Sequence, residues 1–145
     1  MRKLYTIGFT KKNAARFFGL LRDAGVQTVF DVRLNNVSQL AGFAKRDDLQ
    51  FFLSEICHCD YRHELQFAPT QAILDAYKID GGSWYDYEMS FLGLIKTRKI
   101  EAVFRPEELD NACLLCSEAT PEKCHRRLLA QYLNDTLGGF DIIHL

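Results

Sequence analysis

The chain has 145 residues, of which 48% are hydrophobic and 26% are charged, and its formal net charge at pH 7 is −1. This length and apolar content suit one domain with its own core, so we expect a single domain over residues 1–145. A near-neutral charge gives no general attraction to a phosphate backbone, so extended nucleic-acid binding is not favoured. No apolar run approaches the roughly 20 residues that span a bilayer, and no signal-peptide core follows Met1. We therefore expect a cytoplasmic protein without a membrane partner.

The N-terminal part of the chain predicts two strands separated by a helix. Residues 4–7 form a short run suited to a strand, which ends at Gly8. Residues 14–24 carry apolar side chains at helical spacing and stop before Gly25, a common helix end. Residues 26–32 are rich in β-branched side chains, and their length favours a buried strand over a helix.

The middle of the chain predicts helices on either side of a third strand. Residues 45–56 read as a helix with one apolar face, and residues 59–65 as a strand. A short helix over residues 70–77 precedes a longer one that Ser83 caps and that runs through Ile95. We interpret the aromatic residues of this longer helix as core residues rather than as a platform for a ligand ring.

The C-terminal part predicts two further strands, at residues 111–116 and 141–145. Thr120-Pro121 predicts the start of a helix, and Gly138-Gly139 its end. Parallel strands need crossover connections, which are usually helical. The alternation therefore predicts an α/β fold, an open, mostly parallel sheet of about five strands flanked by helices.

Several polar residues fall at the ends of these predicted strands. In open α/β sheets, ligands bind outside the carboxyl ends of the strands. We therefore expect one cleft there, formed by Thr10, Asp31, Arg33, His63, Cys116 and Glu118.

The stretch from Cys116 to Arg126 carries the densest set of reactive side chains. Cys116 closes an apolar strand, and Cys124, His125 and Arg126 fall in the first turns of the next predicted helix. A helix start favours anions, and a thiol near it and near arginine is more readily ionised. His125 suits an acid or base role because its ordinary pKa lies close to neutral pH. Glu118 suits three roles: it orients His125, shares a proton with substrate, or satisfies N–H groups of the loop.

Three of the candidate site residues also have a purely structural interpretation. Asp31 and Arg33 are opposite charges at the end of an apolar strand, where each needs a partner or a ligand. A structural ion pair and a binding site both meet that need. Cys124 is equally open to interpretation, because cysteine is often a core residue.

The five cysteines leave metal binding open as an alternative. Their odd number and the expected cytoplasmic location argue against a disulfide framework. A metal site would combine Cys116, Cys124 and His125 with Cys57, Cys59 or His58, but two Cys-x-x-Cys pairs are not present. Cys113 and Cys116 are three residues apart in a predicted strand and should point to opposite faces, which argues against a redox or metal pair. We interpret Cys57 and Cys113 as core residues.

The motifs of this chain also resemble a known family. Those that carry the resemblance are Thr6-Ile7-Gly8-Phe9, Asp31-Val32-Arg33, Gly42-Phe43-Ala44-Lys45, Ala68-Pro69-Thr70, Cys116-x-Glu118 and Cys124-His125-Arg126. Together they resemble the bacterial and archaeal DUF488 family, a domain of unknown function, across almost the whole chain. The resemblance implies an α/β domain and no assigned activity. Many relatives carry histidine where this chain has Phe9, so any role of that histidine is absent here or filled by His63 or Thr10.

The leading hypothesis is a cysteine-dependent hydrolase or transferase that acts on a small anionic or nucleotide-like substrate, without a metal or other cofactor. The predicted catalytic residues are Cys116, Glu118, His125 and Asp31. The predicted substrate-binding residues are Arg33, Arg126, Thr10, His63 and Cys124. The alternatives are a non-catalytic nucleotide or nucleic-acid binding module and a structural metal-binding domain. Substrate, reaction and oligomeric state stay open.

Overall fold

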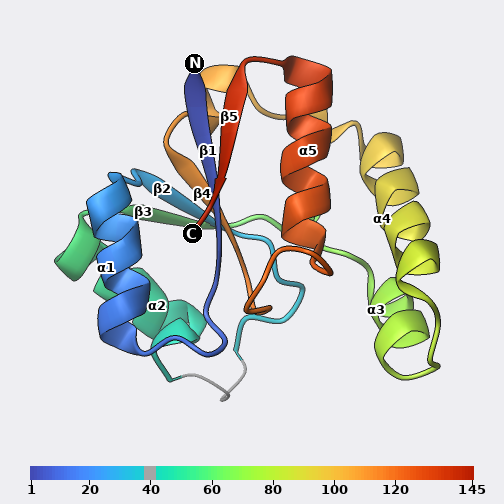
Figure 1. The fold of residues 1–145 in the computed structure, drawn as a ribbon, viewed down its shortest axis with the longest axis horizontal. Helices are drawn as coiled ribbons and strands as arrows, with labels where there is room; N and C mark the ends of the chain where they lie inside the picture. Colours follow the sequence, from blue (N-terminus) through green and yellow to red (C-terminus); the bar gives the residue numbers. More distant parts are fainter. Residues whose placement is uncertain (38–41) are drawn as a thin grey trace.

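The computed structural model describes residues 1–37 and 42–145 and shows one five-stranded sheet within them (Figure 1). All neighbouring strands are parallel, and their order across the sheet is β3-β2-β4-β1-β5. The strands are β1 (Arg2–Gly8), β2 (Thr28–Asp31), β3 (Asp60–His63), β4 (Ala112–Cys116) and β5 (Phe140–His144). The predicted α/β fold is confirmed.

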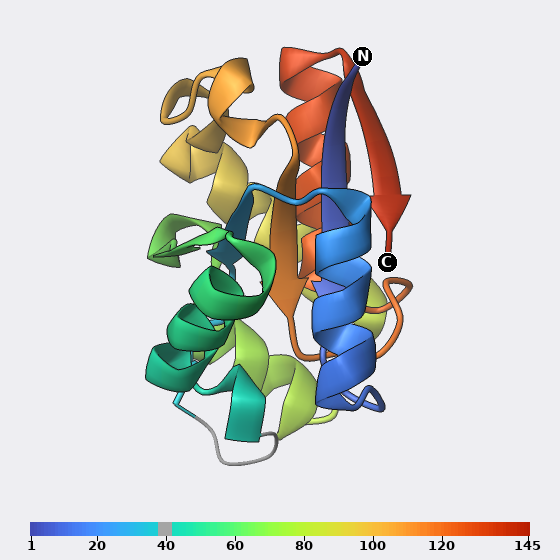
Figure 2. The same ribbon diagram turned by 90° about the vertical axis from the view of Figure 1, so that its left-hand side faces the viewer.

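Helices cover both faces of this sheet (Figure 1, Figure 2). One face packs against α1 (Ala14–Ala24) and α2 (Arg46–Phe52), and the other against α3 (Gln71–Lys78), α4 (Trp84–Arg98) and α5 (His125–Leu137). Each face therefore has its own hydrophobic core. Every residue of the central strand β4 is buried, which explains why its sequence is a continuous apolar run.

Side-chain caps begin three of the helices close to where the sequence predicts them. Asn13 accepts a hydrogen bond from the backbone of Arg16 at α1, and Gly25 ends that helix with φ 74°. Thr70 and Ser83 accept hydrogen bonds in the same way at the starts of α3 and α4. Such caps satisfy N–H groups that have no partner within the helix, so these boundaries are set locally.

The predicted helix over residues 45–56 is only partly correct. The α-helical part is α2, and a π-helical turn, Leu53–Cys57, follows it directly. The turn ends at His58, whose positive φ of 54° reverses the chain toward β3.

The predicted helix start at Thr120-Pro121 is wrong. Helix α5 begins at His125, with Cys124 as its N-cap residue. The Arg127 side chain reaches back and donates a hydrogen bond of 3.2 Å to the carbonyl oxygen of Pro121. Because arginine side chains hold this segment as a loop, Cys124 and His125 lie at the helix start itself.

The strand register brings the polar strand ends together. Gly8 pairs with Cys116, and Asp31 pairs with Leu115 on one side and His63 on the other. Since β4 is central, Cys116 lies in the middle of the carboxyl edge of the sheet. None of the helices in the described ranges combines the length and apolar character needed to cross a membrane.

Candidate functional site

A cavity of about 210 Å³ opens at the carboxyl edge of the sheet. The segments that follow β1 and β2 and the end of β4 form one wall, and α3, α4 and the start of α5 form the others. Cys116, Cys124 and His125 all line it. Of the six residues predicted to form a cleft at this edge, Arg33, Cys116 and Glu118 line the cavity, whereas Thr10, Asp31 and His63 do not.

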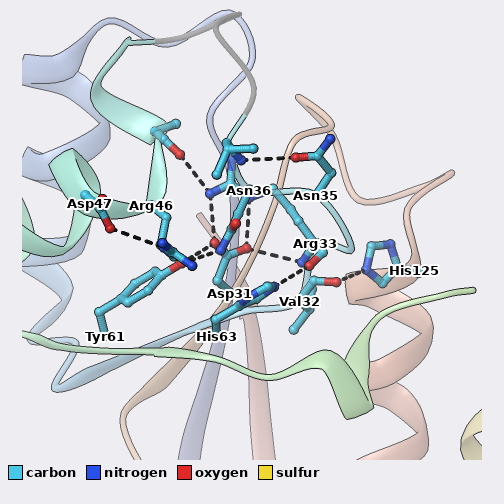
Figure 3. Close-up of polar contacts among 12 residues, drawn as sticks. Asp31, Val32, Arg33, Asn35, Asn36, Arg46, Asp47, Tyr61, His63 and His125 are labelled. Carbon is cyan, nitrogen blue, oxygen red and sulfur yellow. Dashed lines mark hydrogen bonds and ion pairs between the residues drawn. The ribbon is translucent and has the colours of Figure 1, made fainter. Parts of the chain in front are cut away.

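Cys116 and His125 form a thiol–imidazole pair on the cavity wall. The Cys116 Sγ atom lies 3.6 Å from His125 Nδ1. On the other side of the ring, Nε2 lies 2.7 Å from the carbonyl oxygen of Val32 (Figure 3). A carbonyl oxygen only accepts, so Nε2 carries a hydrogen and Nδ1 faces the sulfur. The residue that orients His125 is therefore Val32, through its backbone, and not Glu118.

The two sulfur atoms at the site differ in their acidity. Hydrogen bonding from the Cys124 thiol, together with the charge of His125, holds the pKa of Cys116 well below its ordinary value, although burial works to raise it. The hydrogen bond to Cys116 and burial raise the pKa of Cys124. Burial works to lower the pKa of His125, but the charge of the Cys116 sulfur and the hydrogen bonds to Cys116 and to the Val32 backbone together outweigh it and raise that pKa. The site therefore favours a thiolate on Cys116 beside an imidazolium on His125.

Arg126 is a fully buried cation directly behind this pair. Its Nη1 donates to the carbonyl oxygen of Glu118 at 2.7 Å and to Cys124 Sγ at 3.4 Å. Its Nη2 is buried without a hydrogen-bond partner in the described residues. No carboxylate in those residues pairs with Arg126. Arg126 does not line the cavity, and its predicted contact with substrate stays a prediction.

Gly8 makes room for this arrangement. A Cβ atom at Gly8 would lie 1.6 Å from the carbonyl oxygen of Glu118 and 2.9 Å from Arg126 Nη1. Any side chain at this position would displace the loop that carries Glu118. The glycine is therefore required by the close approach of β1 to the loop before α5.

Asp31 and Arg33 form a buried, bidentate ion pair (Figure 3). Arg33 Nε and Nη2 lie 2.8 Å from the two carboxylate oxygens, and Tyr61 donates to Oδ2 at 2.6 Å. The guanidinium of Arg33 also lies over the ring of Phe9, 5.2 Å from its centre. Arg33 and Phe9 line the cavity, whereas Asp31 does not. In this geometry Asp31 positions Arg33. The predicted catalytic role of Asp31 stays a prediction.

Two other predicted site residues lie outside the cavity. His63 donates from Nε2 to the carbonyl oxygen of Arg33 at 2.8 Å and so supports the same wall from behind. Thr10 is exposed, and its backbone N–H donates to the carbonyl oxygen of Ser117 at 3.1 Å. The structure does not place either side chain where a ligand in this cavity would touch it.

A family comparison agrees with the sequence motifs. A family model described as "Domain of unknown function DUF488" matches residues 13–133. This chain belongs to the DUF488 family. The matched range contains both the Asp31-Val32-Arg33 motif and the stretch from Cys116 to Arg126. No curated protein and no solved structure matches this DUF488 chain.

The DUF488 cavity also has walls that sequence reasoning missed. Trp84 and Tyr87 stack with their ring centres 5.0 Å apart, and Tyr77 lies 5.3 Å from Tyr87. Tyr87 is buried in the core, yet all three rings line the cavity. The interpretation of the aromatic residues of α4 as core residues alone was therefore incomplete. These rings come from α3 and α4, and only their packing beside the sheet edge shows which of them face the cavity.

Charged side chains rim the same cavity. Lys78 Nζ lies 2.9 Å from Glu118 Oε1. Lys123 also lines the cavity and makes no ion pair with any described residue. Neither lysine was predicted, because an exposed lysine in a loop or helix carries no local signal of function. Because Glu118 neutralises only Lys78, Lys123 gives the rim of the cavity a net positive charge.

The same DUF488 site contains a possible metal-ligand set. One ligand atom each from Cys116, Cys124 and His125 lie within 4.8 Å of one another. Cys57 and Cys59 do not join them, because they pack in the core on the α1 side of the sheet. Cys113 also faces that side, opposite to Cys116, as the alternation of side chains along a strand predicts.

Proposed function

We propose that this protein is an enzyme in which the Cys116 thiolate attacks a small anionic or nucleotide-like substrate bound in the cavity. The observation that carries the proposal is the placement of Cys116 Sγ on the cavity wall, 3.6 Å from His125 Nδ1. A thiol becomes an effective nucleophile when a positioned imidazole and a helix start favour its ionised form. In this protein the Cys116 thiol, the His125 imidazole and a helix start lie together where α5 begins.

The site offers a division of roles for such a reaction. The Cys116 sulfur attacks an electrophilic centre of the substrate, and His125, held by Val32, donates a proton to the leaving group. The positive end of the α5 dipole lies beside the sulfur and stabilises negative charge there. This chemistry suits hydrolysis or group transfer through a covalent cysteine intermediate.

The cavity wall supports the proposed substrate class. The rings of Trp84 and Tyr77 offer a surface on which a planar group can stack. Among the described residues Lys123 has no ion-pair partner, and it lies at the rim, where it can meet an anionic group. Arg33 adds little net charge, because Asp31 neutralises it. A ligand with a planar ring and one anionic group fits these contacts better than a purely apolar one.

Labelling with two alkylating reagents tests both parts of the proposal. Iodoacetamide is neutral and iodoacetate is anionic, and both alkylate cysteine through its thiolate form. We expect Cys116 to react rapidly with iodoacetamide below the pH at which ordinary thiols ionise. The ratio of its rate with iodoacetate to its rate with iodoacetamide should be about fivefold higher than the same ratio for a free thiol. A fivefold change corresponds to roughly 1 kcal/mol of attraction between Lys123 and the iodoacetate carboxylate. Mass spectrometry of digested protein reads the label at each cysteine.

Matched variants make this experiment specific. Lys123→Gln should remove the preference for iodoacetate and leave the rate with iodoacetamide unchanged. Cys57→Ser, on the other face of the sheet, should change neither rate. A Cys116 that titrates like an ordinary thiol, near pH 8.5, would instead indicate the non-catalytic binding module.

Zinc binding is a second candidate, favoured by the three clustered ligand atoms. Structural zinc sites use four protein ligands, whereas three ligands with an open position are typical of catalytic sites. Here the open position would face the cavity. Elemental analysis of protein purified without added metal decides this point: stoichiometric zinc supports it, and its absence from correctly folded protein removes it.

A further inference from the structure

We infer that Cys116 and Cys124 form a reversible thiol–disulfide centre, in which Cys124 resolves the mixed disulfides that low-molecular-weight disulfides form on Cys116. This inference rests on the proposed function, because the same Cys116 sulfur begins both reactions. It adds a second substrate class, a small disulfide, and a role for Cys124 that the proposed nucleophilic reaction does not need.

The two sulfur atoms are close enough to bond after a small movement. They lie within 4.8 Å of each other, and a disulfide requires about 2.0 Å. A change of rotamer moves a cysteine sulfur by about 3 Å, so side-chain rotation covers most of the gap. Both residues line the cavity, where a small disulfide can reach them. The other cysteines pack on the opposite face and cannot compete for Cys116.

Cys124 occupies a position that is unusual for a purely structural cysteine. It is the N-cap residue of α5, where serine, threonine, aspartate or asparagine normally accepts a hydrogen bond from the helix. The Cys124 side chain makes no such bond. Its sulfur can therefore rotate toward Cys116 without breaking a cap, and residues 117–123 form a loop that can adjust to the link.

Each sulfur has a cation of its own. His125 Nδ1 lies 3.6 Å from Cys116 Sγ, and Arg126 Nη1 lies 3.4 Å from Cys124 Sγ. Arg126 is fully buried with no carboxylate partner in the described residues. Its charge is therefore removed from water beside Cys124 without a counter-charge, which costs free energy of folding. Arg126 therefore lies where it can stabilise negative charge that develops on the Cys124 sulfur during the exchange.

The reaction balances in two exchange steps. First, the Cys116 thiolate attacks one sulfur of the small disulfide, which forms a mixed disulfide on Cys116 and releases one thiolate. Next, Cys124 loses its proton and attacks Cys116 Sγ, which forms the Cys116–Cys124 bond and releases the second thiolate. The two thiolates take up the protons of Cys124 and His125. One small disulfide is thus reduced to two thiols, and the cysteine pair is oxidised.

Treatment of the reduced, folded protein with oxidised glutathione tests the inference. The wild-type chain should lose about 2 Da, the mass of two hydrogens, and a Cys116–Cys124 peptide link should appear in digests. Cys124→Ser should stop at a glutathione adduct on Cys116, a gain of about 305 Da. Cys57→Ser should behave like the wild type. Cys124→Ala repeats the test if the serine variant does not fold.

Two results would overturn the inference. A wild-type chain that keeps a stable glutathione adduct on Cys116 shows that Cys124 does not resolve it. A Cys116 that reacts rapidly with iodoacetamide but never with oxidised glutathione shows that small disulfides are not substrates. Both results leave the proposed function intact, whereas a Cys116 inert to iodoacetamide as well contradicts both proposals.

Discussion

The buried ion pair behind the cavity allows a quantitative prediction for Asp31→Asn. In the native protein, Oδ1 accepts hydrogen bonds from the Arg33 backbone and Nε, and Oδ2 accepts them from Arg33 Nη2 and Tyr61. An asparagine side chain keeps the shape of the carboxylate but places an NH₂ group against two of these donors. It also leaves the guanidinium of Arg33 buried without a counter-charge.

The expected loss of stability is large because the ion pair is almost completely shielded from water. The side chains of Asp31 and Arg33 are 0% and 6% exposed. Removing one partner of such a pair costs about 3–5 kcal/mol, a large part of the 5–15 kcal/mol that is typical of the free energy of unfolding. For a chain of this size, the melting temperature should fall by roughly 6–20 °C.

Urea unfolding measures this change, with circular dichroism and the fluorescence of Trp84 as independent probes. Asp23→Asn is the matched control: it breaks an ion pair with Arg22 in which Asp23 is 76% exposed, and it should change stability by less than about 0.5 kcal/mol. Arg33→Met and the double variant complete a double-mutant cycle. The double variant should be more stable than the sum of the single losses predicts.

Two outcomes would refute this reasoning. A loss below about 1 kcal/mol in Asp31→Asn would show that the pair is not the buried, desolvated contact described above. A native-like stability combined with a tenfold slower labelling of Cys116 would instead favour the predicted role of Asp31 in the reaction of Cys116. We expect the reverse, a destabilised protein whose native fraction labels at nearly the wild-type rate.

Three further predictions concern the site itself. His125→Gln should lower the rate of Cys116 alkylation at pH 6.5 by about tenfold or more, because it removes the cation that favours the thiolate; an unchanged rate would contradict the thiolate–imidazolium pair. The depressed pKa of Cys116 makes a contribution to stability that is fully present above the ordinary thiol pKa and is lost as pH falls through the depressed value. The raised pKa of His125 contributes in the opposite sense, fully below the ordinary imidazole pKa and lost as pH rises through the raised value. Urea unfolding at several pH values should show both trends in the wild type and a flatter profile in Cys116→Ser. Gly8→Ala should destabilise the protein by about 1–3 kcal/mol or more, since its Cβ would overlap the carbonyl of Glu118. Gly93→Ala, in open space on α4, should instead be neutral or stabilising by up to about 1 kcal/mol, and equal effects of the two changes in thermal unfolding would argue against the close approach at Gly8.

Local signals in the sequence determine the elements of this fold. Short apolar runs, helical spacing and the caps at Thr70 and Ser83 depend on residues within one turn of each other, so they can be recognised without the tertiary structure. The alternation of strands and helices then implies a parallel sheet, and a parallel sheet implies that Cys116 and Asp31 end at the same edge. The class of fold and the place of the reactive cysteine follow from this logic.

The composition of the site depends on contacts between distant segments. The backbone of Val32 orients His125, and rings from α3 and α4 complete the cavity, yet neither fact has a local pattern in the chain. The late start of α5 has the same origin, since arginine side chains hold the preceding loop through its carbonyl groups. By itself, the sequence determined the α/β sheet and the cysteine at its edge. Only the tertiary structure decided which groups face that cysteine, because strand order and helix packing set those distances.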